Sequence, residues 1–143
     1  KGFTMKTSAR NQLCGKVLEV KKGAVNSEVV LELSGGAKLV SVITNEGSDE
    51  LALKAGEEVS AIIKASWIIL STEAPKKISA RNCIEGTVCE IKNGAINAEV
   101  VLNIANGSKI TAVVTEDAVK ELALAVGSKA YAIIKASSII LSA

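Results

Sequence analysis

Two sequence clusters, each present twice, combine basic side chains with hydroxyl groups. Ser8-Ala9-Arg10-Asn11 recurs as Ser79-Ala80-Arg81-Asn82, and Lys64-Ala65-Ser66 recurs as Lys135-Ala136-Ser137. A small oxyanion is held by fixed positive charge together with hydroxyl and backbone N–H donors. The clusters therefore predict a local anion site, although solvated basic side chains and turn-forming serines would give the same residue types.

The clusters recur because the chain is a tandem repeat. A shift of 71 positions aligns residues 8–71 with residues 79–142 without a gap, and roughly 34 of these 64 positions are identical. Surface positions such as Glu57 and its counterpart Ser128 have diverged, so retention of the clusters favours a function. The segment 72–77 holds the only proline and indicates a linker. We expect two modules, residues 5–72 and 77–143.

Each copy shows the pattern of short strands and turns. Along Glu28–Leu33 the apolar side chains Val29, Leu31 and Leu33 alternate with the others, which predicts a half-buried strand. Strands are also expected at 59–64, 67–70, 130–135 and 139–141, with the run 67–70 filling a buried strand and closing its own copy. Residues 116–124 have helical spacing, with Gly127 as the stop. The predicted fold is all-β: two tandem OB-fold-like five-stranded barrels, each with one short helix.

The composition argues against an enzyme. The 143-residue chain contains no histidine, which excludes imidazole acid–base steps, Ser-His-Asp hydrolases and histidine-ligated zinc. Cys14, Cys83 and Cys89 lack CxxC spacing, so we expect thiols in a reducing compartment and no metal site. The formal charge of +2 is too small to indicate a nucleic-acid or membrane surface. We expect no catalytic residues and no cofactor.

Several motifs in order resemble one known family. Ser-Ala-Arg-Asn, Gly-Ala-Val-Asn-x-Glu-Val, Ile-Thr and Lys-Ala-Ser together closely resemble the Mop domain, a molybdate-binding TOBE domain, over nearly the whole chain twice. The resemblance implies barrels that bind molybdate or tungstate at interfaces between modules, often between subunits. Because sulfate is also a tetrahedral dianion, selection must come from the size of the cavity.

The resemblance also implies roles for individual residues. The anion would contact one module at the first cluster and a neighbouring module at the second cluster together with a threonine that ends a strand. These residues are Ser8, Ala9 and Arg10 with Thr44, Lys64, Ala65 and Ser66, and equivalently Ser79, Ala80 and Arg81 with Thr115, Lys135, Ala136 and Ser137.

Two further features qualify this site. Family members often carry a serine three residues after the threonine, whereas this chain has Gly47 and Ala118, so that donor is missing or replaced by Ser48. A second type of anion site is implied at Asn26, Glu28, Asn97 and Glu99. A turn asparagine and a solvent-facing strand glutamate would explain these four residues equally well.

The sequence leaves three candidate functions for this protein. The first is a cytoplasmic protein for molybdate storage and homeostasis, and the second is the effector-binding domain of a molybdate-responsive transcriptional regulator. Residues 1–4, which precede Met5 as if continuing from another segment, favour the regulator, whereas a natural start at Met5 favours storage. DNA would be a partner only if a helix-turn-helix lies upstream. The third, a barrel for single-stranded nucleic acid, lacks aromatic stacking platforms, since Phe3, Trp67 and Tyr131 are the only aromatic residues.

Small modules bury little surface alone, which predicts that the two copies pack together and that chains associate. A module of this size buries only about 60% of its unfolded surface. We therefore expect a homo-oligomer, a dimer or a trimer. No apolar run reaches membrane-spanning length, and the first eleven residues lack the apolar core of a signal peptide. No membrane partner is expected.

Overall fold

The structure is a computed structural model that describes residues 5–143. Residues 1–4 lie outside the described residues. They include Phe3 and the segment before Met5 on which the choice between regulator and storage protein is based. The first half contains β1 (Asn11–Lys22), β2 (Asn26–Leu33), β3 (Lys38–Thr44), α1 (Asn45–Leu51), β4 (Glu58–Ile63), the 3-10 turn η1 (Ala65–Trp67) and β5 (Ile69–Ser71). The second half contains β6 (Asn82–Lys92), β7 (Asn97–Asn103), η2 (Ala105–Gly107), β8 (Lys109–Thr115), α2 (Glu116–Glu121), β9 (Lys129–Ile134), η3 (Ala136–Ser138) and β10 (Ile140–Ser142).

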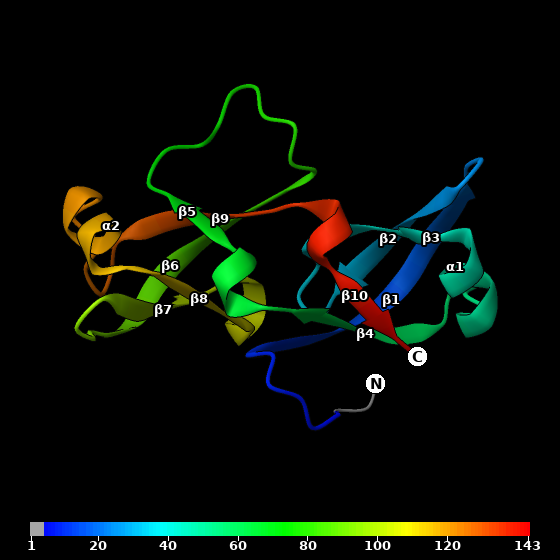
Figure 1. Ribbon diagram of the computed structural model, residues 1–143, viewed down its shortest axis with the longest axis horizontal. Coiled ribbons are helices and arrows are strands. Elements are labelled where there is room, and N and C mark those ends of the chain that lie inside the picture. The colour runs from blue at the N-terminus through cyan, green and yellow to red at the C-terminus, as the bar shows by residue number, and fades with distance from the viewer. Residues whose placement is uncertain (1–4) are drawn as a thin grey trace.

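The strands form two five-stranded antiparallel sheets that exchange one strand. The orders are β10-β4-β1-β2-β3 and β5-β9-β6-β7-β8, so the last strand of each half completes the sheet of the other half. Figure 1 shows this exchange: the red β10 lies among the blue strands of the first half, while β5 lies beside the orange β9. The expectation that the segments 67–70 and 139–141 close their own copies is wrong. Each closes the other copy.

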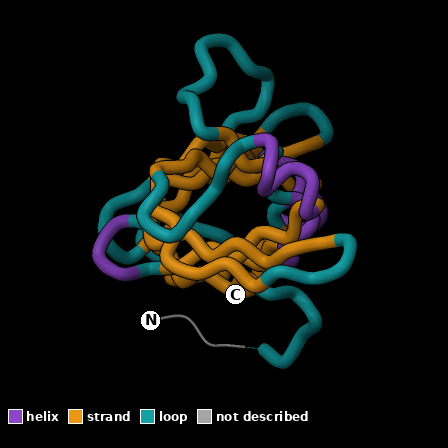
Figure 2. The backbone as a smooth tube through the Cα atoms, turned by 90° about the vertical axis from the view of Figure 1, so that its left-hand side faces the viewer, coloured by secondary structure: helices purple, strands orange, loops and turns teal. Residues whose placement is uncertain are grey.

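Both sheets curl into barrels, and the exchanged segment closes each of them. Viewed along the long axis, the strands lie around a ring (Figure 2). The edge strand β3 contacts η3 and β10, and the buried Ser41 hydroxyl donates a hydrogen bond to the Ile139 carbonyl at 3.0 Å. In the second half, β8 contacts η1 and β5 in the same way. Closure therefore depends on both halves of the chain.

The core follows the alternation read from the sequence. Val29, Leu31 and Leu33 are at most 4% exposed, which confirms the predicted buried face of β2. Their second-half counterparts Val100, Leu102 and Ile104 are buried in the same way. Alternation predicts this burial because successive side chains of a strand point to opposite faces, and here only one face meets the barrel interior.

The structure corrects two local expectations. Trp67 lies in η1 rather than in a strand and is 47% exposed, and Ile69 is 62% exposed, so the run 67–70 is not a wholly buried strand. The reason is that β5 is a sheet edge with one solvent face, so only Ile68 and Leu70 are buried. The second helix ends at Glu121, before Gly127, because Ala123 already adopts a left-handed conformation with φ of 52°.

Within residues 5–143 the structure contains neither a membrane-spanning helix nor a disulfide. None of the helices in this range has the length and apolar character needed to cross a membrane. The three cysteines, which all lie in this range, form no disulfide, with Cys83 exposed and the other two half-buried.

Candidate functional site

The arginine of each Ser-Ala-Arg-Asn cluster forms an ion pair with the other half of the chain. Arg10, just before β1, makes two hydrogen bonds to the carboxylate of Glu99 on β7, one of them 3.0 Å from Nη2 to Oε1. Arg81 pairs with the equivalent carboxylate, Glu28 on β2, through one hydrogen bond from its Nη1. Both predicted arginines thus lie beside residues of the implied second anion site. Because each guanidinium already neutralises a carboxylate, it adds less net positive charge for an anion than the sequence suggested.

The asparagine of the same cluster is buried and joins the halves. Asn82 is 3% exposed, and its amide donates to the Val40 carbonyl at 2.8 Å and accepts from the Val40 N–H at 2.7 Å. It also donates to the Ile134 carbonyl at 3.2 Å. Asn11 makes the equivalent three bonds to Thr111 and Ile63. Retention of this residue in both copies therefore has a structural cause, which sequence reasoning missed because an amide gives no burial signal.

The ion pair of Arg10 predicts a stability change in acid. The hydrogen bond from Arg10, with the charges of Arg10 and Lys92, holds the pKa of Glu99 below the ordinary glutamate value despite partial burial. A carboxylate with a lowered folded-state pKa stabilises the fold above its unfolded pKa and loses that effect as the pH falls through the folded value. The contribution is therefore present at neutral pH and is lost as the pH falls from about 4.5 through the lower pKa of folded Glu99.

We expect Glu99→Gln to lower the urea midpoint at about pH 7 and to have less effect at about pH 3. The matched control is Glu19→Gln, at an exposed position of β1. An equal loss for Glu99→Gln at both pH values would contradict the ion-pair contribution.

One groove gathers predicted site residues from both halves. Thr44, at the end of β3, and Ser137, in η3, line the same groove of about 420 Å³ together with Asn26 and Gly47. The Thr44 hydroxyl accepts a hydrogen bond from the Gly47 N–H at 3.0 Å, so its own proton can be donated to a bound acceptor. We call this groove I. An adjoining groove shares Asn26 and is lined by Glu28 and Arg81, so the ion pair of these two residues lies next to groove I.

The structure regroups the predicted residues. Thr44 lies with Ser137 of the second half rather than with Ser66, because the strand exchange carries η3 onto β3 and η1 onto β8. By analogy with groove I, the equivalent surface in the second half, where η1 with Ser66 packs against β8 and Thr115 ends that strand, is called groove II. Thr115 caps α2 as Thr44 caps α1, accepting from the Ala118 N–H at 3.0 Å.

The remaining predicted site residues fall into a buried group and a solvent-exposed group. Ala65 and Ala136 are buried, so they contribute backbone groups at most, and Ala9 and Ala80 are half-buried. Ser48 is 7% exposed inside α1, which does not place it as a replacement donor on the surface. The exposed residues are Ser8, Ser79, Lys64, Lys135, Ser66, Ser137, Asn26 and Asn97.

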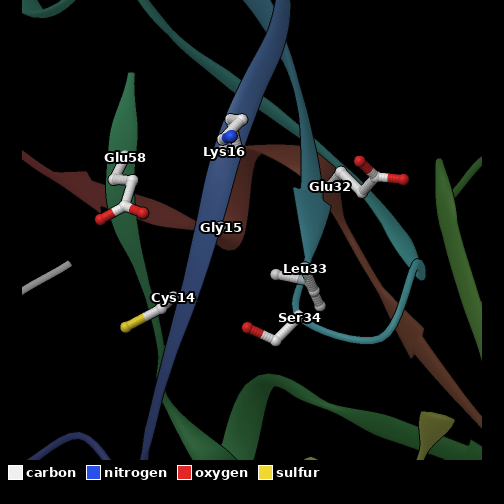
Figure 3. Close-up of a pocket in the computed structure, with 7 residues that line it drawn as sticks. All are labelled: Cys14, Gly15, Lys16, Glu32, Leu33, Ser34 and Glu58. Atoms are coloured by element: carbon white, nitrogen blue, oxygen red, sulfur yellow. The ribbon is translucent and has the colours of Figure 1, made fainter. Parts of the chain in front are cut away.

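A third hollow, which sequence reasoning did not single out, is unsuited to an anion. It has about 360 Å³ and is lined by Lys16 between Glu32 and Glu58, as Figure 3 shows. Two carboxylates against one ammonium give it a negative balance, so we do not place the anion site there. Within the described residues no cluster of acidic and thiol side chains is arranged to hold a metal ion.

The family model for the TOBE domain matches residues 7–70 and again residues 78–141. The chain belongs to the TOBE-domain family. This membership confirms the predicted tandem organisation and mostly β fold, and it places the chain in a family of binding domains rather than enzymes, as expected.

Similar proteins agree with this assignment. The chain is 42% identical over 140 residues to the molybdenum transport protein ModE of Azotobacter vinelandii, covering 98% of this chain and 52% of ModE. It is 44% identical over 141 residues to the molybdenum-pterin-binding protein MopA of Rhodobacter capsulatus, covering 98% of this chain and 53% of MopA. The chain thus spans about half the length of these relatives. A solved structure of the cytoplasmic molybdate-binding protein ModG, with molybdate bound, matches with a TM-score of 0.94 and 50% identity over 96% of this chain and 99% of that chain.

Proposed function

We propose that this TOBE-family chain binds molybdate or tungstate in the cytoplasm and serves molybdenum storage and homeostasis. The observation that carries the proposal is groove I, which is lined by the hydroxyl-bearing residues Thr44 and Ser137 from opposite halves of the chain and adjoins the groove that holds the Arg81–Glu28 ion pair. The similarity to molybdate-bound ModG supports the choice of anion, since that match is the highest identity among the relatives named above.

In this proposal the anion is held by donors and leaves unmodified. Hydroxyl protons from Thr44 and Ser137 would bind its oxygens, and the ammonium of Lys135, two residues before Ser137, would balance charge. Sulfate presents the same charge and shape, so selectivity would rest on the larger radius of molybdate filling the groove.

The alternative is an effector-binding domain of a transcriptional regulator. Its support is the similarity to ModE over 98% of this chain, with ModE nearly twice as long. Sequencing the full reading frame separates the two: an upstream helix-turn-helix would identify a regulator, and its absence would favour storage.

Calorimetric titration with molybdate, repeated in excess sulfate, tests anion binding. We expect heat that persists in sulfate, with one or more anions bound per chain. No heat, or heat abolished by sulfate, would contradict the proposal.

Lys135→Ala is expected to weaken molybdate binding by about 10- to 100-fold, the loss that corresponds to a charge-assisted hydrogen bond. The fold should persist because Lys135 is exposed. Lys129→Ala, at the opposite end of β9 from Lys135, is the control. Equal affinities of the two variants would remove Lys135 from the site.

Homo-oligomer formation stays a prediction, and exposed apolar side chains support it. Val25 and Ile96, at equivalent hairpin turns, are 71% and 77% exposed. Ile69 and Ile140 on the exchanged strands are also exposed. We expect sedimentation as a dimer or trimer, and a monomer at micromolar concentration would contradict this.

A further inference from the structure

The two grooves of the chain are built differently, and we propose that they bind the oxyanion with different affinities, groove I more tightly than groove II. This inference rests on the proposed function and concerns the same sites. It comes from two positions at which the otherwise matching copies differ.

The first difference lies beside the lysine. The Lys64 ammonium is 5.7 Å from the centre of the Trp67 ring, within the range of a cation–π contact. At the equivalent position after Lys135 the chain has Ser138, which offers no ring. If Lys64 balances charge in groove II as Lys135 is proposed to do in groove I, the anion must draw it from the ring or use an ammonium with one side covered. Lys135 carries no such restraint from its own turn.

The second difference lies beside the threonine. A β-carbon at Gly47 would stand 3.3 Å from the Thr44 hydroxyl oxygen, a close contact. In the second half Ala118 carries that carbon. The capping bonds are otherwise matched, since the Gly47 and Ala118 N–H groups both donate to the threonine hydroxyl at 3.0 Å. The hydroxyl of Thr115 is therefore more crowded than that of Thr44.

Both differences act in the same direction. The covered ammonium and the crowded hydroxyl each reduce what groove II offers to an anion, while groove I keeps an open hydroxyl and a lysine without a ring. We expect the two affinities to differ by about five-fold, the ratio that corresponds to an exposed cation–π contact.

The chain supplies both the reporter and the matched variants. Trp67 is the only tryptophan, so its emission reports groove II, whereas calorimetric heat reports both grooves. Titration of the wild-type chain with sodium molybdate should give heat before the emission of Trp67 changes. The double variant Trp67→Ser/Ala118→Gly should bind with one affinity, that of groove I. Serine and glycine already occupy the equivalent positions in the other half, so the variant should fold.

The reverse exchange completes the test. Ser138→Trp/Gly47→Ala should weaken groove I to the level of groove II and give one weaker affinity. Coincident heat and emission in the wild type, with both double variants unchanged, would overturn the inequivalence while leaving molybdate binding intact. Absence of heat and of any emission change in every chain would instead overturn the proposed function and this inference with it.

Discussion

Replacing Ile139 by alanine is expected to destabilise the first half of the chain, although Ile139 belongs to the second half by sequence. Its side chain is 2% exposed, and the segment that carries it packs on β3. Removing a buried isoleucine side chain to alanine costs about 2–5 kcal/mol. Urea unfolding should report this loss in the free energy of unfolding.

Hydrogen exchange should locate the effect. Because β10 pairs with β4, we expect amides of β4 and β1 to lose protection in Ile139→Ala, while amides of β9 keep theirs. Ile68→Ala should give the opposite pattern, since β5 pairs with β9. Lys38→Ala, at an exposed position of β3, is the control and should change stability by about 0.5 kcal/mol or less. Loss of protection in β9 for Ile139→Ala would contradict the exchanged pairing.

The second large effect is expected for Asn82→Ala. The buried amide satisfies the Val40 N–H, the Val40 carbonyl and the Ile134 carbonyl. Its removal leaves three backbone groups without this partner, and each buried unsatisfied group costs about 1–3 kcal/mol, reduced if water enters. We expect a loss of about 2–4 kcal/mol in urea unfolding.

A charge variant sharpens this test. Asn82→Asp keeps the acceptor for the Val40 N–H but turns a carboxylate towards two carbonyl oxygens, which should raise its pKa. A group with a raised carboxyl pKa destabilises the fold when ionised, so Asn82→Asp should regain stability as the pH is lowered. Asn103→Ala, at an exposed position of β7, serves as the control and should be nearly neutral. A neutral Asn82→Ala would show that this amide does not join the halves.

The repeat, the alternating strands and the short helices could be predicted from sequence because each depends on local pattern. The exchange of strands could not. The segments that precede the exchanged strands, Ala61–Ser66 and Ala132–Ser137, are identical, so apolar pattern gives β5 no preference between β4 and β9. Whether β5 pairs with β4 or with β9 depends on the direction in which the chain leaves η1. That direction is set by the three-dimensional fold and not by the local sequence.

The candidate site was also predicted only in part: the residue types followed from the sequence, but their grouping in space did not. Residue types pointed to the hydroxyl-bearing Thr44 and Ser137, which the structure places in one groove, since anion binding requires hydrogen-bond donors. Their grouping was missed because Thr44 meets Ser137 only after the strands exchange. The roles of Arg10 and Asn11 in joining the halves were missed because their partners lie about 90 to 100 residues away in sequence.

The exchange of β5 and β10 has a consequence for biosynthesis. During translation the first half emerges without the strand that completes its sheet, because β10 follows every other described strand in chain order. If each half were a separate polypeptide, the same exchange would require two molecules to meet, at a rate set by their concentration. The tether through residues 72–81 makes it a unimolecular step at high effective concentration. Gene duplication and fusion would thus have converted an assembly reaction into a folding reaction.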